Sequence, residues 1–230
     1  MIIVISVTTA MLGRRSTRAF LNRPVPLNEV RDIIDVARRA PSGGNLQPWR
    51  LIALAGDDLT QFKAAVHANL KQNPRGDGPE FPVYPNPLRE PFDGRRRKCG
   101  EDMYAAIGVT REDRAGRLQQ FARNYDFFGA PVGMILAMDR SMEPAQWADI
   151  GIFLQSILLL AYERGLATCA QASWAAVHKT VRAHLGLPDD MVVICGVSLG
   201  YPDVDHPINS ATMDREPVAT VAELRGFGDR

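Results

Sequence analysis

The chain has 230 residues, a length that fits one domain with room for an insertion and a sizeable core. Its 27 basic and 26 acidic residues nearly cancel, which argues against recruitment of nucleic acid or of an anionic membrane surface. Three widely spaced cysteines without a CxxC pair argue against a disulfide framework and a thiolate metal site, so we expect a protein of the reducing cytoplasm.

The first half of the chain predicts helices around one strand. A short helix should end near Arg15, and a second helix should cover residues 26–40 with Asn28 as its N-cap. Residues 49–56 are typical of a strand and residues 57–71 of a third helix. Six prolines between residues 73 and 94 then exclude regular structure over most of that stretch, which we interpret as an insertion or a lid.

The second half centres on one strongly apolar helix. Helices are predicted over 95–106 and 111–125, a strand over 131–139, and the apolar helix over 144–164, stopped by Gly165. Its apolar run, 150–162, is too short for a membrane span. A strand at 166–172, a helix ending at "LGLP", a strand at 191–201 and a polar, extended tail complete the chain. The apolar helix exceeds what one small sheet needs, so we expect an α+β layer packed on a second subunit.

Two polar motifs suggest a bound ligand. "RRSTRAF", residues 14–20, concentrates guanidinium groups, which hold phosphate oxygens in a bidentate fork, and Ser16 and Thr17 add hydroxyl donors. "APSGGNLQPW", residues 40–49, joins two glycines to amide and hydroxyl side chains that can read the edge of a planar heterocycle. The alternatives are a solvated basic turn for the first motif and a helix C-cap with a turn for the second.

Other candidate motifs favour structural roles. The basic run "RRRK", residues 95–98, is followed at once by acidic residues and is expected to be a solvated helix face. The four histidines show no metal-ligand spacing and are expected at the surface or at helix ends, so no metal site is predicted. The GxG at residues 76–78 is followed by Pro79, which cannot open a dinucleotide-binding helix. Cys169 is expected to be a small buried hydrophobic residue rather than a redox thiol.

Taken in order, the motifs resemble those of the nitroreductase family of FMN-dependent oxidoreductases, in particular its nitroaromatic and nitrobenzoate reductase-like members. "RRSTRAF", "APSGGNLQPW", "FFGAPVGMILAMD", "DIGIFLQSILLLAYERGLATC" and "REPV" follow the family order over nearly the whole chain. The resemblance implies a nitroreductase-like α+β sandwich with a central, mostly antiparallel sheet flanked by helices, in an intertwined homodimer. It also implies a single domain over residues 1–230, with a lid at about 73–128 and a tail at about 202–230 that wraps the partner.

The resemblance further assigns cofactor-binding residues. The FMN phosphate and ribityl chain would be held by Arg14, Arg15, Ser16, Arg18 and, from the tail, Arg215. A loop that reaches the flavin from the other subunit would contain Pro41, Ser42, Gly43 and Asn45. A backbone N–H for flavin N5 would come from Gln171, Ala172 or Ser173. Thr212 and Met213 stand where many members carry a second basic residue, which weakens the tail's expected share of phosphate binding.

The activity implied is the reduction of nitroaromatic or quinone-like acceptors by NADPH or NADH, which would use one pocket in turn. No catalytic side chain is predicted, because the cofactor carries the reaction. Tyr125, Phe127 and Phe128 either stack on the aromatic acceptor or anchor the lid, and the sequence favours neither role; of these, Tyr125 and Phe128 are the candidate substrate residues. Two alternatives stay open: a flavin-binding storage or sensor protein, and a reductive dehalogenase-type relative.

Overall fold

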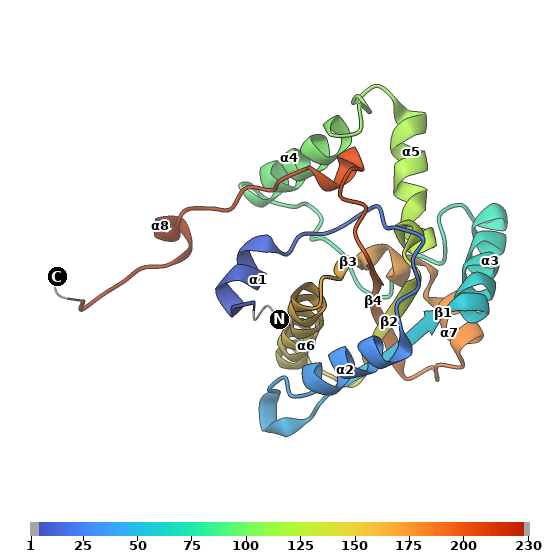
Figure 1. Cartoon of the computed structure of the whole chain (residues 1–230), viewed down its shortest axis with the longest axis horizontal. Coiled ribbons are helices and arrows are strands. Elements are labelled where there is room, and N and C mark those ends of the chain that lie inside the picture. Colours follow the sequence, from blue (N-terminus) through green and yellow to red (C-terminus); the bar gives the residue numbers. More distant parts are fainter. Residues whose placement is uncertain (1–4, 228–230) are drawn as a thin grey trace.

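The computed structural model describes residues 5–227, and its elements follow the chain as drawn in Figure 1. The first half contains α1 (Val7–Gly13), α2 (Leu27–Ala37), β1 (Trp49–Ala55), α3 (Gly56–Gln72), α4 (Phe92–Ala105) and α5 (Arg114–Ala122). The second half contains β2 (Val132–Asp139), α6 (Pro144–Glu163), β3 (Ala167–Gln171), α7 (His178–Leu185), β4 (Met191–Gly200) and α8 (Val218–Val221). Short 3-10 helices are η1 (Gly43–Asn45), η2 (Arg123–Gly129), η3 (Ala172–Val177) and η4 (Pro207–Asn209).

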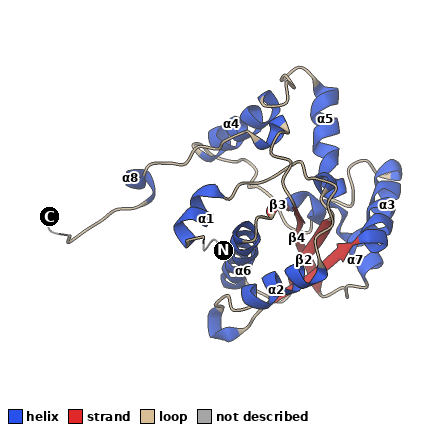
Figure 2. Cartoon of the chain, viewed as in Figure 1, coloured by secondary structure: helices blue, strands red, loops and turns tan. Residues whose placement is uncertain are grey.

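The four strands form one antiparallel sheet in the order β1-β2-β4-β3. Figure 2 shows helices on both faces of these strands, which confirms the α+β class. The N-terminal segment extends the sheet beyond β3, where Ser16 forms a parallel bridge with Thr168. The segment that carries the arginine motif is therefore fixed to the free edge of β3.

Two cores lie on opposite faces of the sheet. On one face α2 and α6 cover the strands, and Trp49 stacks on Phe153 with ring centroids 4.7 Å apart. On the other face Trp174 stacks on Phe127 at 4.2 Å, within the core that α3 and α7 cover. A side chain at Gly196 would overlap the Trp174 ring, so glycine there lets the indole lie flat on the sheet.

The predicted elements are confirmed with three corrections. Asn28 is not the N-cap of α2, because the helix begins at Leu27 and Pro26, extended at ψ 143°, occupies the cap position. The helix predicted over 111–125 is split into α5 and η2, since Phe127 and Phe128 adopt left-handed backbone angles. The tail is not simply polar and extended: it contains η4 and the single turn α8, and it exposes apolar side chains.

Helix α6 spans Pro144–Glu163, within one residue of the predicted bounds at each end. Its 20 residues are long and apolar enough to cross a membrane, but one side of the helix packs on the sheet as part of the core. Only 33% of its most apolar window is buried within the chain. Ala148, Gly151 and Ile152 are exposed, and Leu159 is partly exposed, at helical spacing along the side turned away from the core. The chain thus leaves an apolar stripe on α6 uncovered.

Candidate functional site

The arginine motif runs between β3 and the segment that follows β4. The backbone N–H of Thr17 donates to the carbonyl of Thr168 at 2.9 Å, and that of Leu21 donates to Tyr201 at 2.9 Å. Because these bonds fix the backbone on both sides, the side chains of the motif are held in defined directions. The motif is an ordered part of the sheet edge and not a free basic turn.

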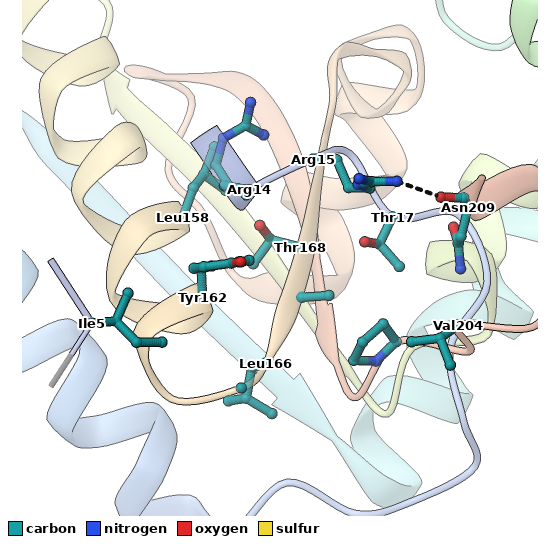
Figure 3. A pocket seen from close by; sticks show the side chains of 14 residues that line it. Ile5, Arg14, Arg15, Thr17, Leu158, Tyr162, Leu166, Thr168, Val204 and Asn209 are labelled. Atoms are coloured by element: carbon teal, nitrogen blue, oxygen red, sulfur yellow. Dashed lines mark hydrogen bonds between the residues drawn. The ribbon is translucent and has the colours of Figure 1, made fainter. Parts of the chain in front are cut away.

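Asn209 locks this segment to the tail. Its Oδ1 accepts from the backbone N–H of Arg18 at 2.8 Å, and its Nδ2 donates to the carbonyls of Ala19 and Asp203, each at 2.8 Å. Its own carbonyl accepts from the Arg15 guanidinium at 3.1 Å, the bond drawn as a dashed line in Figure 3. This buried amide uses its donors and acceptor to place the arginines, a role that the sequence analysis did not find.

The arginines gather without acidic partners. Arg14, Arg15, Arg18 and Arg215 form no ion pair with a carboxylate of residues 5–227. The guanidinium groups of Arg15, Arg18 and Arg215 donate to backbone carbonyls. Burial lowers the pKa of Arg14, and the charge of nearby Arg215 lowers it further. These four residues and Ser16 line one cavity of about 430 Å³. Clustered, partly desolvated cations without acids make an anion-binding site.

Two further cavities adjoin this anion site. One, of about 1020 Å³, lies between α4 and the tail, and the other, of about 450 Å³, lies at the end of β3. Arg18 lines all three cavities. Tyr84 and Tyr104 line two of them, the cavity of about 1020 Å³ and the cavity at the end of β3, which we call the β3 cavity. A ligand with a phosphate at one end could therefore extend from the arginines toward β3 beneath the residues of the predicted lid.

The end of β3 presents backbone to the β3 cavity. The side chain of Gln171 is fully occupied, since its Nε2 donates to Asn124 and its Oε1 accepts from Ser198 at 2.7 Å. Ala172 and Ser173 begin η3, and the first N–H groups of a helix have no partner within it. Both residues line the cavity, so backbone donors rather than the Gln171 side chain are available there.

Cys169 lies beside the arginine motif, buried at 3% exposure. Burial raises the pKa of its thiol, and the nearby Arg18 guanidinium and Ser16 hydroxyl oppose that shift without reversing it. A thiol kept protonated is a poor nucleophile. The prediction that Cys169 is a buried hydrophobic residue is confirmed.

The aromatic residues after α5 divide into two roles. Phe127 is fully buried in the core on Trp174, whereas Tyr125 and Phe128 are buried but line the β3 cavity. The Tyr125 ring packs edge-on against Trp174, and burial raises the pKa of its phenol. Phe127 and Phe128 both have positive φ, at 50° and 56°, a costly conformation for aromatic residues. This backbone sends neighbouring rings to opposite sides, one into the core and one to the cavity.

The basic run on α4 does more than face solvent. Arg95 pairs with Glu216 at 2.8 Å, and Lys98 pairs with Asp102 at 2.6 Å and with Asp214 at 3.0 Å. Both side chains remain exposed, as expected of a solvated helix face, and they also pair with the tail, which lies against α4 (Figure 1). The two pairs hold the acidic neighbours of Arg215 on either side of it.

The loop predicted to meet the ligand lies elsewhere in the same chain. The backbone N–H of Gly43 donates to both carboxylate oxygens of Asp149 at 3.2 Å, near the start of α6. The arginine motif lies near the other end of α6, where Gly13 packs against Tyr162. At 1.5 Å per residue, Asp149 and Tyr162 are about 20 Å apart along the helix. Within one chain, the loop with Pro41, Ser42, Gly43 and Asn45 does not meet the arginines.

The loop is held in a strained conformation although it is exposed. Asn45 and Gln47 have positive φ, at 58° and 51°, and Gly44, directly before Asn45, has 56°. Only two other non-glycine residues described share this property, Phe127 and Phe128. Left-handed angles in non-glycine residues persist where surrounding contacts determine them, often at binding sites.

One histidine departs from the sequence analysis. His178 begins α7 as expected of a helix end, but it is buried at 7% exposure beside Glu80, and this desolvation lowers its pKa. Burial works against ionisation of Glu80, but hydrogen bonds from Arg140 and Arg182, each at 2.6 Å, lower the pKa of its carboxyl overall. This cluster fastens the proline-rich stretch to α7 and the sheet.

Comparison with known proteins gives consistent matches over most of the chain. The family model described as Nitroreductase family matches residues 11–201. A chloronitrobenzene nitroreductase of Comamonas testosteroni is 41% identical, covering 88% of this chain and 89% of its own, and a 4-nitrobenzoate reductase of Nocardioides sp. (strain LMS-CY) is 41% identical, covering 90% and 84%. The crystal structure of the FMN and NADPH-dependent nitroreductase NfnB from Sphigopyxis sp. strain HMH superposes with a TM-score of 0.94 at 43% identity, covering 97% of this chain and 100% of that one.

Proposed function

The chain belongs to the nitroreductase family, and from this premise we propose that it is an FMN-dependent enzyme that oxidises NADPH or NADH and reduces nitroaromatic or quinone-like acceptors. One observation carries the proposal: four arginines that pair with no carboxylate in the described part of the chain line a cavity that adjoins an aromatic-lined cavity at the end of β3. A phosphate at one end and a flat ring at the other is the ligand shape that suits this pair of cavities. The anion site thus fits FMN through the chemistry of its donors.

Bound FMN supplies the redox chemistry, because it takes hydride from a nicotinamide and passes electrons to an acceptor. The chain's own residues bind the cofactor and orient it. Arg14, Arg15, Arg18 and Arg215 hold the phosphate, with Ser16 as a hydroxyl donor. The backbone N–H groups of Ala172 and Ser173 are the hydrogen-bond donors available to the flavin ring at the end of β3. The buried Tyr125 and Phe128 keep water from that end of the site.

We propose that the enzyme is a homodimer joined through α6. Its exposed stripe would pack on the same stripe of a second copy across a two-fold axis, and antiparallel packing sets the start of one helix beside the end of the other. The partner's loop, with its Pro41, Ser42, Gly43 and Asn45, would then lie next to this chain's arginines. Such an arrangement joins the two halves of the site that one chain keeps about 20 Å apart.

The tail and the inserted segment complete the proposed assembly. The tail runs past α4 and away from the body (Figure 1), and exposes Val218, Val221, Leu224 and Phe227. Four uncovered apolar residues on an extended tail support a tail, from about residue 202 on, that wraps the partner. We assign the lid to about 73–128 within a single domain. The balanced charge supports a soluble cytoplasmic enzyme that binds neither nucleic acid nor membranes.

Anaerobic half-reactions test the proposed activity. The purified protein should carry FMN, NADPH or NADH should bleach its flavin absorbance, and a nitroaromatic compound should restore the absorbance without oxygen. A storage or sensor protein would bind FMN but resist bleaching by the nicotinamide. A dehalogenase-type enzyme would release halide from a halogenated aromatic acceptor and leave its nitro counterpart unreduced.

The Phe128→Ala variant should raise KM for a nitroaromatic acceptor and leave flavin reduction by NADPH unchanged. Phe128 lines the β3 cavity, so its loss removes an aromatic contact of about 0.5–1.5 kcal/mol from acceptor binding. Stopped-flow reduction and steady-state kinetics separate the two steps. Unchanged acceptor kinetics, or a slowing of flavin reduction by NADPH alone, would contradict a role of Phe128 in acceptor binding. Leu118→Ala serves as the control on α5, because Leu118 is 69% exposed and lies outside the lining of the β3 cavity.

A further inference from the structure

We infer that the acceptor of this enzyme is an uncharged aromatic compound and not an aromatic carboxylate. The inference rests on the proposed function and concerns the β3 cavity, the one lined by Tyr125 and Phe128. Both kinds of acceptor can carry a nitro group, so the flavin motifs alone do not distinguish them. Whether the cavity accepts a carboxylate depends on whether a positively charged side chain on its wall is available to pair with it.

The walls of the β3 cavity are almost free of charge. Its apolar lining includes Val83, Tyr84, Met103, Tyr104, Phe121 and Phe128. Its polar lining consists of three amide side chains, the hydroxyls of Ser173 and the tyrosines, the Cys169 thiol and backbone, and Arg18 is the single charged residue among the lining residues. Arg18 also lines the anion cavity, where the cofactor phosphate requires its charge. A carboxylate placed against these walls would lose its hydration without gaining a cation.

The lid cations that line the neighbouring larger cavity, Arg95, Arg96 and Lys98, are already paired with carboxylates. Arg96 pairs with Asp93 at 2.8 Å, and Arg117 pairs with Glu101 at 2.6 Å. Arg95 and Lys98, described above, pair with acidic residues of α4 and the tail. A substrate carboxylate could recruit one of these cations only by displacing its present partner. The lid residues that line these two cavities therefore contribute flat and apolar surface but little free positive charge.

Two uncharged polar groups on the cavity wall lack partners among residues 5–227. The Nε2 atom of Gln120 and the Oγ atom of Ser173 are buried without a hydrogen bond, and Gln120 is only 7% exposed. A buried donor without a partner is unfavourable, so a ligand that supplies an acceptor oxygen is favoured there. Nitro and carbonyl oxygens of a neutral compound accept such bonds without bringing a net charge into the cavity.

Binding of two redox-inert analogues to the FMN-loaded protein tests this inference directly. Benzamide and benzoate share a shape, and benzoate is ionised at pH 7.5. Titration followed by the flavin absorbance spectrum should give a Kd for benzamide at least about tenfold below that for benzoate. The values of kcat/KM for 4-nitrobenzamide and 4-nitrobenzoate should fall in the same order. Equal or tighter binding of benzoate would overturn the inference, whereas absence of FMN or of nicotinamide-driven bleaching would overturn the proposed function instead.

A charge placed at the cavity edge should reverse the preference. Phe121 lines the cavity and is 48% exposed, so Phe121→Arg adds a cation without burying it. We expect the ratio of benzoate to benzamide affinity to rise at least about fivefold. Leu118→Arg, on the same helix but 69% exposed and outside the cavity lining, is the matched control and should leave the ratio unchanged. A ratio that Phe121→Arg does not move, or that Leu118→Arg moves equally, would contradict binding of the acceptor in this cavity.

Discussion

An Arg18→Ala variant should bind FMN at least about tenfold more weakly than the wild-type chain. Arg18 lines the anion cavity and the two cavities beside it, and no carboxylate of residues 5–227 forms an ion pair with it. A charge-assisted hydrogen bond to phosphate contributes about 1.5–3 kcal/mol, and 1.4 kcal/mol corresponds to a factor of ten. Equilibrium dialysis of FMN at low and moderate salt measures the loss.

The control for Arg18→Ala removes the same charge far from the anion site. Arg31 is exposed on α2, outside the three cavities, so Arg31→Ala changes the net charge equally but should leave FMN affinity within twofold. Tight FMN binding by Arg18→Ala, unaffected by salt, would show that the phosphate lies elsewhere.

A charge in the apolar stripe of α6 should abolish the dimer and the cofactor together. Ile152 lies 43% exposed in the middle of this stripe, so Ile152→Glu does not disturb the core of its own chain but would bury two like-charged groups in the proposed interface. Sedimentation velocity should show a folded monomer, and the flavin absorbance should be lost with the dimer. Leu158, further along the same apolar helix, would not serve, because it is buried in the core and its substitution would test folding.

The matched control for Ile152→Glu is Ala68→Glu. Ala68 is exposed on α3, which covers the opposite face of the sheet from α6. The same added charge there should leave both the dimer and the FMN content intact. A monomeric Ile152→Glu protein with full FMN content would contradict a site shared between subunits.

The sequence predicted most helices and strands correctly because their bounds depend on residues close by in the chain. Gly165 adopts φ 70° where α6 ends, and Gly186 caps α7 in the left-handed region. A glycine directly after an apolar helical pattern is a common signal of a helix end. The pattern of helices and strands indicated the α+β class, whereas the antiparallel order of the strands was implied only by the family resemblance. The bounds of α3, β1, β2 and α6 accordingly lie within two residues of those predicted.

Long-range contacts account for what the sequence did not predict. Asn209 is distant in sequence from the arginines that it positions, and no local pattern marks a tail asparagine as their support. The ion pairs of Arg95 and Lys98 with the tail depend on the path of the tail over α4. Phe127 and Phe128 read as one aromatic cluster, because the left-handed backbone that separates their roles is set by packing and not by residue type.

Mixed dimers test the shared site most directly. One protomer would carry Arg18→Ala, and the other Asn45→Asp, which suits a left-handed residue but places a negative charge near an anionic cofactor. Each variant homodimer should lose FMN. In the heterodimer, one site joins both altered segments and the other joins an intact arginine motif to an intact loop, so the account predicts one FMN per heterodimer. A heterodimer without FMN would contradict it, because a site built from one chain leaves every copy damaged.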